Sequence, residues 1–369
     1  MAEPCSNATA TSKPAAAEPP LDAANVKPPQ KKSARMATVS NTPAPDGDTS
    51  GEEDPEEEEP SVEDAEILED LPDETEEIEL VHSRLNSISN LGLPRFGPYL
   101  RKLCLRQNYI SFLDPEVLQT LEVLEELDLY DNKVKHIDGA LDKLSKLSVL
   151  DLSFNLLKHV PEALEQLTSL RTVYFVQNRI SHITGLHSLG STLRSLELGG
   201  NRLRRIENLD ALVNLEELWL GKNKIAKLEN LGSLKRLKVL SIQSNRITKL
   251  EGLENLESLE ELYLSHNGIE RLEGLEHNHK LRTLDIGNNF VKVLENVSHL
   301  STLEELWFND NQISTLDHVE PQLQHISSLE TVYLEGNPVQ KSEGANYRRK
   351  VMLALPQIKQ LDATYVKQF

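Results

Sequence analysis

An asparagine recurs at a nearly constant step through most of this chain of 369 residues. From Asn201 to Asn311 the interval is 22 residues each time, and the other intervals run from 23 to 26 residues. A fixed period of this length predicts a solenoid, because each unit can bury its apolar side chains only against its neighbours. The recurring residues are Asn108, Asn132, Asn155, Asn178, Asn201, Asn223, Asn245, Asn267, Asn289, Asn311 and Asn337.

Each asparagine lies in the frame L-x-L-x-x-N-x-[IVL]-x-x-[ILV], and positions are counted here from that asparagine. In the repeat at Asn223, Leu218 and Leu220 occupy positions −5 and −3. This alternation predicts a short strand whose residues at −6, −4 and −2 face away from the core. After Asn223 the apolar residues recur at steps of three, beginning with Ile225 and Leu228, which predicts 3₁₀ or irregular turns.

The asparagines themselves are assigned a structural role. A buried amide can bond the backbone of the neighbouring coil where the strand bends away, which satisfies groups that would be costly to bury unpaired. The predicted fold is therefore an α/β solenoid, a leucine-rich repeat horseshoe of about 11 to 12 units with a parallel sheet on its concave side. At a strand spacing of about 4.8 Å the inner edge is roughly 50–55 Å long.

Three regions are predicted along the chain. Residues 78–336 hold the repeats, the first of which is degenerate and carries Ser83 at the asparagine position. Residues 337–369 hold the last repeat and a C-terminal cap, in which residues 347–355 read as an amphipathic helix halted by Pro356. Solenoid ends need such caps because they otherwise expose core.

Residues 1–77 form the third region and carry most of the negative charge. They hold 21 Asp and Glu against 5 Lys and Arg, out of a formal charge of −20 for the chain. With few large apolar side chains, this acidic tail is predicted to be disordered. Ser50 and Ser61 precede acidic residues and are candidate phosphorylation sites, and Lys31, Lys32 and Arg35 belong to a weak candidate nuclear-import segment.

The composition also bears on the compartment. The two cysteines, Cys5 and Cys104, are too few for a disulfide framework, and no apolar run approaches the roughly 18 residues that span a bilayer. We expect a soluble intracellular protein, in nucleus and cytoplasm with the nucleus favoured, and no membrane partner.

Residues at position −4 face the concave surface and are not needed in the apolar core. Five of the eleven occupants of this position are aromatic, four are acidic and none is basic, in a chain that is 5 % aromatic. In order they are Cys104, Asp128, Asp151, Tyr174, Glu197, Trp219, Ser241, Tyr263, Asp285, Trp307 and Tyr333. Rows of exposed rings among polar groups mark binding surfaces, although rings on adjacent strands could also simply pack on each other.

Neighbouring positions strengthen the binding interpretation. Glutamates occupy position −6 in several repeats, including Glu305, and Gly199, Gly221 and Gly287 at −2 leave room for a partner. The expected partner is a folded protein with a basic, partly apolar patch. Nucleic acid is not expected, since its phosphates would meet carboxylates.

The sequence predicts no enzyme, no cofactor and no metal site. It contains no glycine-rich phosphate loop, H-E-x-x-H or G-x-S-x-G pattern. His277 and His279 are the only close histidine pair, and they have no cysteine nearby. The carboxylates at position −4 lie on a face expected to be open, without a pocket to shift a pKa.

The period, the steps of three and the end segment N-P…Y-R-R…L-P…L-D, from Asn337 to Asp362, resemble the family of protein phosphatase 1 regulatory subunit 7. Stretches such as Ser-His-Asn-Gly-Ile-Glu at 265–270 carry the same resemblance, which covers about residues 78–369. It implies a non-catalytic subunit whose concave face binds the phosphatase catalytic subunit and modulates its activity, assembly or location. By position, the implied contacts are Asp151, Tyr174, Glu197, Trp219, Asp285, Glu305, Trp307 and Tyr333, to which position −4 adds Tyr263.

Two alternatives stay open at this point. The chain could be a general acidic leucine-rich adaptor of the nucleus or cytoskeleton rather than a phosphatase subunit. The sequence also leaves open whether a further phosphatase regulator joins the complex.

Overall fold

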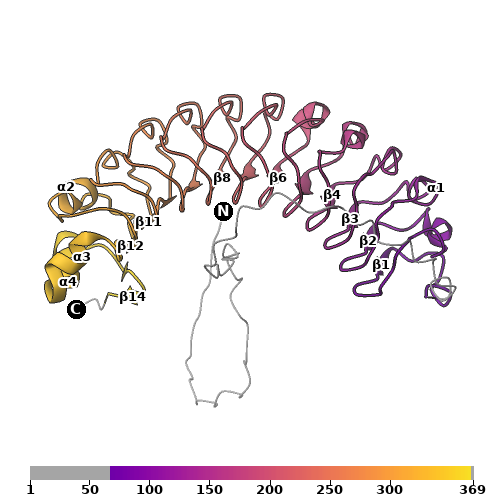
Figure 1. The fold of residues 1–369 in the computed structure, drawn as a ribbon, viewed down its shortest axis with the longest axis horizontal. Coiled ribbons are helices and arrows are strands. Elements are labelled where there is room, and N and C mark those ends of the chain that lie inside the picture. Colours follow the sequence, from indigo (N-terminus) through magenta and orange to yellow (C-terminus); the bar gives the residue numbers. More distant parts are fainter. Residues whose placement is uncertain (1–66, 367–369) are drawn as a thin grey trace, which may run out of the picture. The chain divides into compact units, whose positions relative to one another are not determined.

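The computed structural model describes residues 67–366, which form a single curved solenoid with all strands on its inner edge (Figure 1). Consecutive strands pair in parallel from β1 to β13, and only the last strand, β14, runs antiparallel. The predicted horseshoe is therefore confirmed. The strands are β1 Glu77–Glu79, β2 Lys102–Cys104, β3 Glu126–Asp128, β4 Val149–Asp151, β5 Thr172–Tyr174, β6 Ser195–Glu197, β7 Glu217–Trp219, β8 Val239–Ser241, β9 Glu261–Tyr263, β10 Thr283–Asp285, β11 Glu305–Trp307, β12 Thr331–Tyr333, β13 Gln360–Leu361 and β14 Thr364–Tyr365.

The predicted inward and outward positions are correct. In β7 the middle residue, Leu218, is fully buried at position −5, and Glu217 and Trp219 on either side are more accessible. Ile225 and Leu228 on the far side of the same coil are equally buried. One apolar core therefore runs the length of the solenoid, between the sheet and the convex turns.

The asparagines form the expected ladder. Asn223 donates from Nδ2 to the carbonyls of Leu198, one repeat back, and of Leu220, at 2.9 and 3.0 Å. Its Oδ1 accepts the backbone N–H of Leu203 at 3.0 Å. Each amide thus joins two coils and satisfies backbone groups that leave the strand, where no strand partner remains for them.

A second hydrogen-bonded turn occurs seven residues after the ladder asparagine in each of the repeats from Asn201 to Asn289. Asn208, Asn230 and Asn296 adopt φ near +58°, and each donates from Nδ2 to a carbonyl of the preceding repeat at 2.7 Å. Gly252 and Gly274 fill the same position in the intervening repeats with φ of 72° and 73°. Only Gly and Asn adopt this left-handed conformation readily, so the alternation of these two residue types follows from the turn.

The secondary structure on the convex side depends on the number of residues between successive ladder asparagines. Repeats of 22 residues have turns closed by i to i+3 bonds, as from Leu234 N–H to the Leu231 carbonyl at 3.0 Å. Helices occur in four of the five longer intervals, because one to four added residues complete a helical turn. Two are 3₁₀ helices as expected, and two are short α-helices, which the steps of three did not predict. The helices are η2 Leu93–Phe96, α1 Pro115–Leu118, η3 Glu162–Gln166, η4 His187–Ser191, α2 Val319–Leu323, α3 Pro338–Glu343, η5 Gly344–Asn346 and α4 Tyr347–Ala354.

The N-terminal cap begins earlier than expected. Leu68 is 3 % exposed and packs against the core, although it lies in the segment assigned to the acidic tail. The Arg95 side chain holds this turn by donating to the Leu68 carbonyl at 2.5 Å and the Leu71 carbonyl at 2.9 Å. The part of the predicted tail that the structure describes, residues 67–77, is therefore folded; Cys5, Ser50, Ser61 and the proposed import segment lie outside the described residues.

The C-terminal cap contains the predicted helix, α4, whose Tyr347 and Val351 are buried. The Tyr347 hydroxyl donates to Asp362 Oδ2 at 3.2 Å, and Asp362 Oδ1 accepts the backbone N–H of Leu334 at 2.8 Å. No helix within residues 67–366 is long and apolar enough to cross a bilayer.

The ladder predicts the effect of one substitution. Asn223→Ala leaves the buried Leu203 N–H without its acceptor and removes one of the two asparagine donors to each of the Leu198 and Leu220 carbonyls. We therefore expect the free energy of unfolding to fall by about 1–3 kcal/mol. Asn255→Ala, at an exposed asparagine outside the ladder, is the control and should change it by less than about 0.5 kcal/mol. Urea unfolding followed by circular dichroism measures both, and equal losses would contradict the assigned role.

Candidate functional site

The concave face carries all nine predicted contact residues on strands β4 to β12. Eight of them end a strand at position −4, and Glu305 begins β11 at position −6. The strand pairing sets their order, since Asp151 lies beside Tyr174, Tyr174 beside Glu197, and Glu197 beside Trp219. The structure therefore brings these four side chains together in one row across neighbouring repeats.

The middle of the row concentrates negative charge. Burial and the neighbouring carboxylates Asp151 and Glu217 raise the pKa of Glu197 to about 7. Burial likewise raises the pKa of Asp151, whose Oδ1 accepts the backbone N–H of Ser153 at 2.8 Å. From the sequence we expected an open face that leaves pKa values unchanged. That expectation is wrong, because adjacent strands hold these carboxyl groups side by side and partly out of water.

Trp219 begins an aromatic cluster that spans three strands. Its ring stacks on Tyr263 with centroids 6.2 Å apart, although β8 lies between their strands. Ser241 occupies the intervening position and is 3 % exposed, so its small side chain lets the two rings meet above it. The Tyr263 hydroxyl donates to Glu261 Oε2 at 2.8 Å, which orients that ring.

Trp307 and Tyr333 form a second cluster. Their rings meet edge to face with centroids 5.8 Å apart, and the Tyr333 hydroxyl accepts from Gln360 Nε2 at 2.7 Å. The rings thus pack on one another as well as lining the concave face. The indole Nε1 atoms of Trp219 and Trp307 are both buried, and neither has an acceptor within the described residues.

Asp285 is less accessible than expected. It is 3 % exposed, and its carboxylate accepts from Gln243 Nε2 and from the backbone N–H of Gly287, both at 3.0 Å. The space above Gly287 is also taken, since a Cβ built there would lie 2.7 Å from Asn309 Oδ1. Asp285 is therefore placed to support its neighbours rather than to meet a partner directly.

Position −2 contributes residues that the sequence analysis missed. Arg106 bonds Asp128 at 2.8 Å, lies 3.8 Å from Asp151, and covers the Tyr130 ring with its guanidinium carbon 4.1 Å from the centroid. Tyr130 in turn packs on Phe154 at 4.8 Å. Arg106 and Tyr130 stand out at position −2 among mostly small side chains, and this contrast is the sequence signal that marks them.

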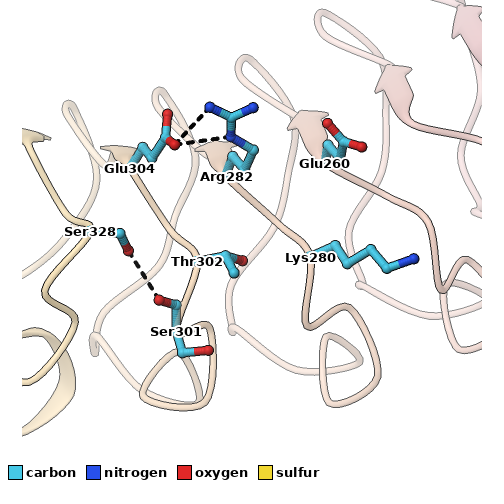
Figure 2. A pocket seen from close by; sticks show the side chains of 7 residues that line it. All are labelled: Glu260, Lys280, Arg282, Ser301, Thr302, Glu304 and Ser328. Atoms are coloured by element: carbon cyan, nitrogen blue, oxygen red, sulfur yellow. Dashed lines mark hydrogen bonds and ion pairs between the residues drawn. The ribbon is translucent and has the colours of Figure 1, made fainter. Parts of the chain in front are cut away.

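A recess lies away from this face, at the edge where the strands begin. Figure 2 shows Arg282 paired with Glu304, with Nη2 and Oε1 2.7 Å apart, and Lys280 and Thr302 beside them. Its volume is about 440 Å³, and neither histidine nor cysteine lines it. Within residues 67–366 no three His, Cys, Asp or Glu side chains gather so as to hold a metal ion.

The comparisons with known proteins agree with this architecture. Two family models described as leucine-rich repeats match residues 98–157 and residues 190–267 and 253–369. The chain is 49 % identical over 83 residues to protein phosphatase 1 regulatory subunit SDS22 of Saccharomyces cerevisiae, a match that covers 22 % of this chain and 24 % of that protein. It is 63 % identical over 46 residues to protein phosphatase 1 regulatory subunit 7 of Mus musculus, covering 12 % of each.

Solved structures extend the likeness over most of the fold. A leucine-rich repeat protein of Leptospira interrogans superposes with a TM-score of 0.59 at 27 % identity, over 72 % of this chain and 74 % of that one. An internalin of Listeria monocytogenes gives a TM-score of 0.61 at 23 % identity, over 79 % and 87 %. The resemblance seen in the sequence is thus confirmed, and the chain belongs to the leucine-rich repeat proteins.

Proposed function

We propose that this chain is a regulatory subunit of protein phosphatase 1 that binds the catalytic subunit through its concave face. The observation that carries the proposal is the 46–63 % identity of its segments to proteins named as regulatory subunits of that phosphatase. Because the matched segments span a quarter or less of those relatives, the assignment of partner and role is an inference for the whole chain.

The chemistry of the concave face supports a protein partner. Trp219 and Trp307 each lie in an aromatic cluster, and tryptophan is enriched among the residues that contribute most to protein–protein binding.

On the N-terminal side of both clusters, the carboxyl groups of Asp151, Glu197 and Glu217 repel one another. A lysine or arginine of the partner would relieve this repulsion, and such complementarity favours rapid and specific association. The partner surface that fits is basic near Glu197 and apolar where it meets Trp219 and Trp307. In this role the chain modulates the activity, assembly or nuclear location of the phosphatase and performs no catalysis itself.

Two single variants test the surface. Trp307→Ala removes an aromatic anchor and Glu197→Ala removes the central carboxylate, and each should weaken binding of the purified catalytic subunit by about 30-fold or more. Both side chains are partly exposed, so each variant should remain folded and show a cooperative thermal transition. Phe290→Ala, at an exposed ring after β10, is the control and should bind normally. Binding retained in both variants would rule out the concave face.

Recovery of partners from cell extract tests the identity of the partner separately. The wild-type chain should recover a phosphatase catalytic subunit as its main partner by mass spectrometry, and the two variants should lose it. Recovery of unrelated proteins through the same residues would instead favour a general adaptor.

The raised pKa of Glu197 predicts opposite pH effects on stability and binding. Between pH 4.5 and about 7 the folded chain holds a proton that the unfolded chain releases, so the free energy of unfolding falls as the pH rises through this window. Affinity for a basic partner should rise over the same window, because the ionised carboxylate is the binding form.

Replacement of this one carboxyl group isolates both effects. Glu197→Gln should gain on the order of 1–2 kcal/mol of stability relative to wild type at pH 8 but little at pH 5, after allowance for partial exposure. Urea midpoints at the two pH values measure the gain, with Glu270→Gln at an exposed site as the control. An equal difference at both pH values would show that Glu197 does not titrate in this range.

A further inference from the structure

The edge of the sheet where the strands end carries an unusual charge distribution. In four consecutive repeats, the segments that follow β5 to β8 are residues 177–183, 200–206, 222–228 and 244–250. Together they contain nine Lys and Arg and no Asp or Glu, although acids outnumber bases in the chain by 59 to 39. The positive charge is therefore gathered here against the overall composition.

Most of these cations have no counter-charge. Seven are exposed and form no ion pair within residues 67–366, and they are called the basic strip: Arg179, Arg202, Arg204, Arg205, Lys222, Lys224 and Arg246. The other two, Lys227 and Lys249, lie 3.6 and 3.7 Å from Glu251. These ion pairs with Glu251 mark the convex-side limit of the basic strip.

The backbone fixes the strip in a line. The N–H groups of Arg202, Lys224 and Arg246 each donate to a carbonyl of the preceding repeat at 2.8 Å. The backbones that carry these cations therefore stand one strand step apart, about 4.8 Å, and like charges on adjacent coils are neighbours. Like charges on adjacent coils destabilise one another, and an anionic ligand would remove the repulsion.

The opposite edge of the same sheet shows that the fold does not require unpaired charges. There Glu216 lies between Arg194 and Lys238, at 3.9 and 2.6 Å, and Arg282 pairs with Glu304 (Figure 2). Alternating signs neutralise that edge repeat by repeat. The lack of such pairing in the basic strip therefore points to a ligand.

The width of the strip selects the kind of anion. Acidic side chains border it on both sides, with Glu197 and Glu217 on the concave face and Glu207, Glu229 and Glu251 toward the convex face. A duplex or a membrane surface would bring its own anions against these carboxylates. The four segments also hold no Phe, Tyr or Trp, the stacking residues typical of sites for single-stranded nucleic acid.

We infer that the basic strip binds an extended acidic segment of a partner polypeptide, lying across the four repeats along the solenoid axis. Three strand steps span about 15 Å, which roughly five extended residues cover. Aspartate and glutamate side chains of such a segment pair with the guanidinium and ammonium groups of the strip. The strip lies outside the concave face, so this inference does not depend on the phosphatase proposal.

A labelled peptide of about ten residues, alternating Glu and Ser, tests the inference with the full chain. Fluorescence anisotropy should show binding that weakens as salt is added. The triple variant Arg202→Gln, Lys224→Gln, Arg246→Gln should bind about tenfold more weakly. The matched control Lys235→Gln, Arg236→Gln, Lys280→Gln removes the same charge from exposed positions outside the strip and should lose less than about twofold.

Two results would overturn the inference. One is an equal loss in the strip variant and its control, which would indicate general attraction only. The other is tighter binding of an oligothymidylate of matched length than of the peptide. Circular dichroism confirms folding, and the charge-conserving variant Arg202→Lys, Arg246→Lys should keep the affinity within about threefold, so that loss of structure is distinguished from loss of charge.

Discussion

The hydrogen bonds of the asparagine ladder determine how every other part of this protein is placed. Each amide joins the backbone of two adjacent coils, as Asn223 joins the carbonyl of Leu198 to that of Leu220. The residue before each asparagine adopts a left-handed conformation, even where it is as bulky as Phe154, with φ of 55°. Strain of about 1 kcal/mol at such a position is tolerated because the amide satisfies several buried backbone groups at once.

Uniform register has a consequence for the inner face. It places identical positions of successive repeats side by side, so that Tyr174, Glu197 and Trp219 become direct neighbours although 23 and 22 residues separate them in the chain. The same geometry places carboxyl groups close together and raises the pKa of Glu197. The concave face thus holds groups that reduce the stability of the free protein, a common property of surfaces shaped for binding.

Much of the fold could be predicted from the sequence, because the same pattern of apolar residues and asparagine occurs in every repeat. The strand positions and the inward residues were predicted from spacing, and a helix was predicted over residues 347–355 from its amphipathic pattern and Pro356, close to the observed Tyr347–Ala354. Spacing alone could not predict the burial of Asp285, because Asp285 accepts a hydrogen bond from the Gln243 side chain two repeats away. Nor could it predict that Trp219 contacts Tyr263 above Ser241. The sequence did not predict that the fold begins at Leu68, because acidic residues surround that leucine. The average composition of residues 1–77 indicates disorder, and a single buried leucine hardly changes that average.

The two ends of the sheet differ from its interior in a way that limits assembly. An uncovered end strand would offer its unpaired N–H and C=O groups to another molecule, and stacked solenoids could then grow into fibres. At one end β1 is three residues long and presents the glutamates Glu77 and Glu79, so two such ends repel. At the other end β14 reverses direction over two residues, Thr364 and Tyr365, and breaks the parallel pattern that a further repeat would need. The direction of the last short strand therefore disfavours the addition of a further coil in the parallel register at this end.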